Sequence, residues 1–246
     1  NRVLLEMNGA TWGLWPELIV FALTGVIGGI VGVSFVLFEN KAGRYIGSIT
    51  IIPPWIKPVL GGFLLGLFAL FFPFVLGEGY EYIEMAMDLK FTMGMFFLIM
   101  IMKIFATGWT LGTGGSGGVF APSLVIGSML GGGIFLLSSS LFPGIVGSPE
   151  TYIAVGIATI LGSAFKAPMT AIMMVMEITN NYAIVLPVMI AAVCSTFMGW
   201  AILKGRSIYN IKLIQEGIRE VETDFWVPRS HLVLSREKSV KGNTSV

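Results

Sequence analysis

Three long apolar runs constrain this chain more than any other feature of its sequence. They cover residues 17–38, 55–76 and 91–111, and each is close to the ~20 residues that a helix needs to cross a bilayer. Charged residues make up only 12% of the chain, about half the share found in ordinary soluble domains. One soluble core could not hide runs of this length, so we expect an all-α integral membrane protein.

The charge distribution excludes one class of partner and suggests an orientation. The formal net charge is +1, so nothing favours nucleic acid as a partner. Eight of the fifteen Lys and Arg residues follow residue 203, and cytoplasmic segments of membrane proteins carry an excess of these residues. We therefore expect a multi-pass protein of the plasma or inner membrane, with its polar C-terminal tail, residues 218–246, in the cytoplasm.

In the second half of the chain, most apolar segments are shorter and are interrupted by glycine, proline or polar residues. The sequence predicts helices over residues 119–137, 151–165, 168–177 and 184–203. The second of these is too short to cross a bilayer unaided. Transporters use short, broken helices to bring helix ends to the membrane midplane.

A glycine run at residues 112–118 leads directly into the first of these helices, at Val119. The first amides of a helix have no intrahelical partner, and the helix dipole makes that end positive. Pro122 falls in the first turn, and residues 119–137 contain no acidic residue. The pattern therefore predicts an anion site, with a glycine-rich linker or a close helix crossing as the alternative. It lacks the Gly-Lys-Ser/Thr of a nucleotide-binding loop, and we expect neither a cofactor, a metal nor an enzymatic activity.

Three motifs in the same order resemble those of the CLC family of chloride channels and chloride/proton antiporters. Gly118-Val119-Phe120-Ala121-Pro122 is similar to the family's Gly-x-Phe-x-Pro motif. Residues 166–182 resemble its basic-Ala-Pro-x-Thr helix ending in Glu-x-Thr-x-Asn-Tyr, and residues 205–209 resemble the stretch that carries the pore tyrosine. The likeness covers about residues 15–217 and implies a CLC-like inverted-repeat helical bundle with tilted, broken and re-entrant helices.

The resemblance also implies how chloride is bound. The amides of Val119 and Phe120, with Gly118 leaving room for the ion, would face chloride from one side, and the Tyr209 hydroxyl would donate to it from the inner side. A neutral phenol coordinates an anion without trapping it, which suits conduction. An interfacial tyrosine is the alternative for Tyr209.

Two other anion-binding loops of the family, Gly-Ser-Gly-Ile-Pro and Gly-Lys/Arg-Glu-Gly-Pro, do not occur in this chain. The chain thus resembles the C-terminal half of the membrane domain, without its N-terminal half. We expect a connector (residues 1–16), a membrane domain (17–203), a pore-facing final helix (204–217) and a tail (218–246). The resemblance implies a homodimer through residues 17–38 and 168–203. Two alternatives remain: a non-transporting half-CLC subunit that packs with or regulates a partner, and an unrelated transporter with broken helices.

Four further features invite a functional or a structural interpretation. Lys103 lies deep in an apolar run, as an electropositive lining of an anion path or as a paired structural lysine. Residues 77–84 carry three carboxylates, and we expect a wetted loop rather than a cation or proton site. We expect Glu177 to be a buried, hydrogen-bonded carboxylate rather than a proton relay, and we give Lys166 no role in the site.

Overall fold

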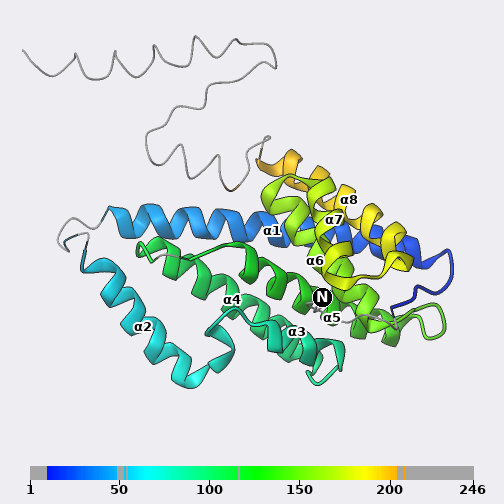
Figure 1. The fold of residues 1–246 in the computed structure, drawn as a ribbon, viewed down its shortest axis with the longest axis horizontal. Coiled ribbons are helices and arrows are strands. Elements are labelled where there is room, and N and C mark those ends of the chain that lie inside the picture. Colours follow the sequence, from blue (N-terminus) through cyan, green and yellow to red (C-terminus); the bar gives the residue numbers. More distant parts are fainter. Residues whose placement is uncertain (1–9, 49–52, 54, 116, 204–207, 209–246) are drawn as a thin grey trace, which may run out of the picture. The chain divides into compact units, whose positions relative to one another are not determined.

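The computed structural model describes residues 10–48, 53, 55–115, 117–203 and 208, which belong to one compact unit. All regular elements within these residues are helices, confirming the all-α class (Figure 1). They are α1 (Glu17–Gly47), α2 (Lys57–Phe71), the 3₁₀ turn η1 (Pro73–Val75), α3 (Tyr80–Met87), α4 (Met93–Gly112), α5 (Phe120–Leu141), α6 (Pro149–Phe165), α7 (Pro168–Thr179), the 3₁₀ turn η2 (Tyr182–Ile184) and α8 (Val185–Leu203). Four described segments are long and apolar enough to span a bilayer: α1, α4, α5 and the segment of η2 and α8.

Helix α1 is longer than the sequence predicts. The apolar run ends at residue 38, but the helix continues through the polar residues that follow it to Gly47. Polar residues alone do not end a helix, and the orphan carbonyls at this end find a partner. The Nζ atom of Lys57, at the start of α2, donates to the carbonyls of Ile46 (3.0 Å) and Gly47 (3.2 Å).

Helix α1 packs against α6 on one side and α8 on another, and its glycines allow both contacts (Figure 1). A Cβ added at Gly25 or Gly29 would lie 2.7 Å from atoms of α8. A Cβ at Gly28 or Gly32 would collide with Thr159 and Ser163 of α6, respectively. The two offset glycine pairs therefore face two different helices, as small residues do where membrane helices cross closely.

The run over residues 55–76 is not one spanning helix. Helix α2 ends at Phe71 and gives way to η1, because the residue before Pro73 is pushed out of the helical region. Phe72 accordingly has φ −131° and ψ 78°. A Cβ at Gly62 or Gly66 would meet nothing within 4 Å, whereas a Cβ at Gly61 would collide with Thr113 at the end of α4.

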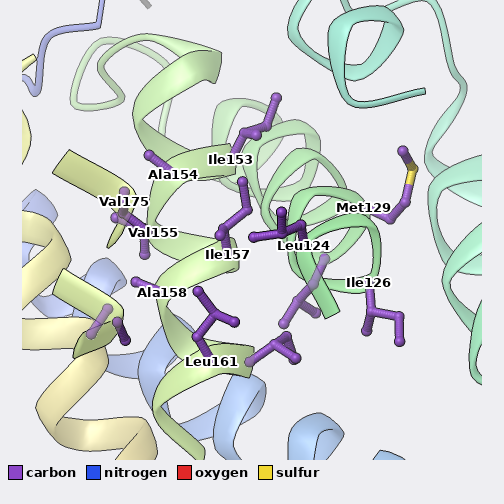
Figure 2. Close-up of a cluster of buried hydrophobic side chains, with 14 of the residues drawn as sticks. Leu124, Ile126, Met129, Ile153, Ala154, Val155, Ile157, Ala158, Leu161 and Val175 are labelled. Carbon is purple, nitrogen blue, oxygen red and sulfur yellow. The ribbon is translucent and has the colours of Figure 1, made fainter. Parts of the chain in front are cut away.

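Helix α6 forms the centre of the core. It has only 17 residues, too few to span unaided, and nearly all are buried. Its apolar side chains meet those of α5 on one side and of α7 on another (Figure 2). Gly131 of α5 and Gly156 of α6 lie at this crossing, where an added Cβ would overlap the facing backbone. This packing fixes where α5 begins and ends, and so positions the glycine run.

Candidate anion-binding site

Helix α5 begins at Phe120 with its first amides open. The preceding residue, Val119, already has near-helical angles, φ −83° and ψ −13°. No side chain caps this end, and the first turn holds no acidic residue. The amides of Gly118 and Val119 donate to no other described residue, whereas the Ser123 amide donates to the Val119 carbonyl at 3.2 Å. The partial positive charge of the helix N-terminus is therefore not neutralised by this segment.

This helix end opens on a cavity of about 550 Å³. Gly117 and Gly118 are exposed, and a Cβ at Gly118 would meet nothing within 4 Å. The remaining walls come from α2, the turn at residues 75–78, Tyr80 of α3 and one face of α4. At Gly118 the glycine run therefore leaves free space in front of the amides, whereas a Cβ at Gly112 would lie 3.0 Å from the backbone of α1.

Lys103 of α4 lies in the wall of the same cavity and is only 2% exposed. Its Nζ atom donates to the carbonyl of Gly77 at 2.8 Å and to that of Val75 at 3.3 Å. The hydrogen bonds agree with a paired structural lysine, and the role of lining an anion path stays a prediction. The lysine is paired with backbone oxygens, and it lines the space in front of α5.

The turn that accepts these hydrogen bonds leads into α3. Gly77 and Gly79 have φ of +66° and +85°, which glycine adopts without strain. We expected a loop over residues 77–84, but Tyr80 begins a helix whose Ile83 and Ala86 side chains are buried. Because the buried pair spans only one helical turn, α3 has little periodic signal in the sequence.

Two side chains beside this turn line the cavity without having been predicted to do so. The Glu78 carboxylate is exposed, and Tyr80 is half-buried. Burial and then the negative charge of Glu78 raise the pKa of the Tyr80 phenol, so it stays a neutral hydrogen-bond donor at ordinary pH. Their contact with a helix about forty positions further along the chain comes from tertiary packing, which spacing alone does not reveal.

The comparisons with known proteins identify the family of the chain. The sequence model described as "Voltage gated chloride channel" matches residues 3–199. The chain belongs to the voltage-gated chloride channel family. The CLC resemblance seen in its motifs is thereby confirmed.

Relatives with assigned names extend the family match. The chain is 29% identical over 225 residues to the "H(+)/Cl(-) exchange transporter ClcA" of Cronobacter sakazakii, covering 88% of this chain and 47% of that protein. It is 30% identical over 218 residues to the protein of the same name from Yersinia pestis, covering 85% and 44%. The chain therefore spans about half the length of the curated relatives it matches.

The fold has a solved counterpart. The crystal structure of a slow cyanobacterial Cl−/H+ antiporter superposes with a TM-score of 0.78 at 24% identity, covering 89% of this chain and 52% of that one. This likeness confirms the CLC-like helical architecture.

The structure gives different outcomes for the other residues that the sequence analysis named. Tyr209, with most of the predicted pore-facing segment 204–217 and the tail 218–246, lies outside the described residues. Glu177 is exposed and makes no hydrogen bond with another described residue, so the expectation of a buried, bonded carboxylate is wrong. Lys166 follows the last residue of α6 with φ +57°, and its Nζ donates to the Gly199 carbonyl of α8 at 2.8 Å.

Phe120 has a second neighbourhood that the motif does not reveal. It also lines a smaller cavity of about 270 Å³, bounded by the end of α6 and the beginning of α7. Phe120 thus lines two cavities, and it is also the first residue of α5.

Proposed function

We propose that the protein containing this chain transports chloride across a membrane, as a channel or a chloride/proton antiporter of CLC type. In this proposal the amides of Val119 and Phe120 bind the anion, Gly118 leaves room for it, and the Tyr209 hydroxyl donates to it from the inner side. The names of the relatives favour proton-coupled exchange.

One observation carries the proposal: an uncapped helix N-terminus, free of acidic residues, opens on a 550 Å³ cavity in a member of this family. Backbone amides and a helix dipole favour an anion there. Because neutral amide donors hold the ion weakly enough for release, such a site supports conduction.

The sharpest test removes a single backbone donor. Val119 has φ −83°, close to the value that proline imposes, and Gly118 before it has no Cβ to clash. Val119→Pro should therefore preserve the helix start while deleting one amide N–H. A hydrogen bond to a charged group contributes about 1.5–3 kcal/mol, so we expect the chloride dissociation constant to rise about tenfold or more.

The matched control is Val119→Ala, which shortens the side chain but keeps the amide. Both variants are made in the full-length protein and tested by calorimetric chloride titration and by chloride efflux from liposomes. Tyr209→Phe tests the second donor in the same assays, and proton counterflow distinguishes an exchanger from a channel. Equal affinity in the proline and alanine variants would show that the Val119 amide does not bind the anion.

We also propose that two such subunits associate through residues 17–38 and 168–203. Exposed large apolar side chains within these ranges support this proposal, including Ile19, Leu23, Met169, Met173, Phe197 and Trp200. Replacing Phe197 and Trp200 of α8 by alanine should weaken the dimer, as measured by subunit counting in membranes. Leu70 and Phe71 of α2 are equally exposed but lie outside these ranges, and their replacement should leave the dimer intact.

Two further experiments test the membrane location and the alternative of a non-transporting subunit. We propose a plasma or inner membrane location with the C-terminus in the cytoplasm, which a reporter fused after residue 246 tests. Folded full-length protein that carries no chloride in liposomes would overturn the transport proposal and favour a non-transporting half-CLC subunit.

A further inference from the structure

Lys103 is a cation placed where a membrane protein rarely leaves one. It lies on α4, a helix long and apolar enough to span the bilayer, and only 2% of its surface is exposed to solvent. Ionisable groups inside membrane segments are costly and generally face the protein interior or a water-filled cavity. Lys103 faces a cavity, together with the open end of α5.

The hydrogen bonds of Lys103 stabilise its charge without cancelling it. Both acceptors, the carbonyls of Gly77 and Val75, are neutral. Within the described part of the chain Lys103 has no carboxylate within 4 Å. The ammonium group therefore adds a full positive charge to a cavity wall that already carries the positive end of a helix dipole.

Lys166 shows what a lysine with a purely structural role looks like in this fold. Its Nζ atom also donates to a backbone carbonyl, that of Gly199, at 2.8 Å. That carbonyl lies on α8, so this hydrogen bond joins the end of α6 to a neighbouring helix. Lys166 does not line the 550 Å³ cavity, whereas Lys103 does.

We propose that Lys103 is an anion-attracting residue of the transport path: its charge raises the affinity of the cavity for the chloride ion that the amides of Val119 and Phe120 bind. The inference rests on the proposed chloride transport and deepens it, because it names a side chain that sets the potential at that site. Glu78 lines the same cavity with the opposite charge, so it lowers the affinity that Lys103 raises.

The test separates charge from hydrogen bonding by using three substitutions at one position in the full-length protein. Lys103→Arg keeps the charge, Lys103→Gln keeps a donor for the carbonyls but loses the charge, and Lys103→Met loses both. We expect the chloride dissociation constant to rise about fivefold or more in the Gln and Met variants and to stay within about twofold of wild type in the Arg variant. Glu78→Gln should shift it the opposite way, and Lys166→Gln, the matched control, should leave it unchanged.

The outcomes are distinct. A Gln variant with wild-type affinity beside a Met variant with lower melting temperature would overturn the inference, because Lys103 would then act only as a hydrogen-bond donor. If the neutral variants do not fold, Glu78→Gln decides, since unchanged affinity there overturns the inference and tighter binding supports it. Wild-type protein that neither binds nor carries chloride would overturn the proposed function itself, whereas chloride transport with no effect of charge at residues 103 and 78 would remove this inference alone.

Discussion

The N-termini of α5 and α6 are built in opposite ways, although the two helices pack against each other. Helix α6 begins after Ser148, whose extended backbone (φ −85°, ψ 149°) and carbonyl start the helix, and Pro149 occupies its first position. Glu150 places a carboxylate in the first turn, and the buried carboxylate of Glu17 accepts the amide of Gly147 at 2.6 Å. This end is supplied with negative charge and hydrogen-bond acceptors.

Helix α5 lacks these carboxylates. Neither helix has a side-chain cap, but no acidic residue lies in the first turn of α5, and glycines lead into it. The contrast shows that the chain uses carboxylates at a helix N-terminus that serves packing and leaves them out at the one that opens on a cavity. An acid at α5 would occupy the position that we assign to chloride, and this makes the comparison testable.

The largest effect is expected from putting an acid where α5 lacks one. In Val119→Asp, a carboxylate at the helix N-terminus would compete with chloride for the same amides and repel it at short range. We expect the chloride dissociation constant to rise about 100-fold or more. The free energy of unfolding should not fall, because the new charge interacts favourably with the helix dipole.

The neutral control for this change is Val119→Asn, which has nearly the same shape without the charge. Chloride titration and thermal unfolding in detergent measure both quantities on the same samples. If the aspartate variant bound chloride as tightly as the asparagine variant, the open end of α5 would not be the anion site.

A smaller and different effect is expected at α6. Both oxygens of Glu17 accept backbone amides, those of Gly13 and Gly147, and the side chain is 0% exposed. In Glu17→Gln the amide NH₂ group would face one of these donors and leave it unpaired, which costs about 1–3 kcal/mol. We expect a lower melting temperature with an unchanged chloride dissociation constant. A loss of chloride affinity at constant stability would contradict the division of roles between the two helix ends.

Much of the site was predictable because its signals are local in sequence. The glycine run, Pro122 and the lack of acidic residues placed the open helix end within one residue of the observed start of α5. The end of α6 at Phe165 and the start of α7 at Pro168 were also predicted, while α7 ends at Thr179, two residues past the predicted end, before Asn180 with φ +48°. These features were predictable because they depend on the φ and ψ preferences of individual residues such as glycine, proline and asparagine.

The predictions failed where contacts between residues far apart in the sequence determine the structure. The carbonyl partners of Lys103 are 26 and 28 residues away in the chain, so spacing did not reveal them. Helix α1 continues past residue 38 with Lys57 of α2 at its end, and α3 forms on a buried pair too short to give a periodic signal. Glu177 was expected to be buried because its neighbours are apolar, but it points away from the core.

The smallest effect is expected at Ser148, before the first residue of α6. Its Oγ accepts the Thr11 amide and lies 3.1 Å from the Thr151 hydroxyl, while the helix itself starts from the Ser148 carbonyl, which accepts the Thr151 amide at 3.2 Å. Ser148→Ala keeps that carbonyl and removes only the side-chain bonds, so we expect a loss of about 1 kcal/mol in unfolding free energy and no change in chloride affinity. The effect should be smaller than that of Glu17→Gln, because the bond to Thr11 is exposed to solvent and water can replace it. The reverse order would mean that the serine rather than the buried carboxylate holds this end together.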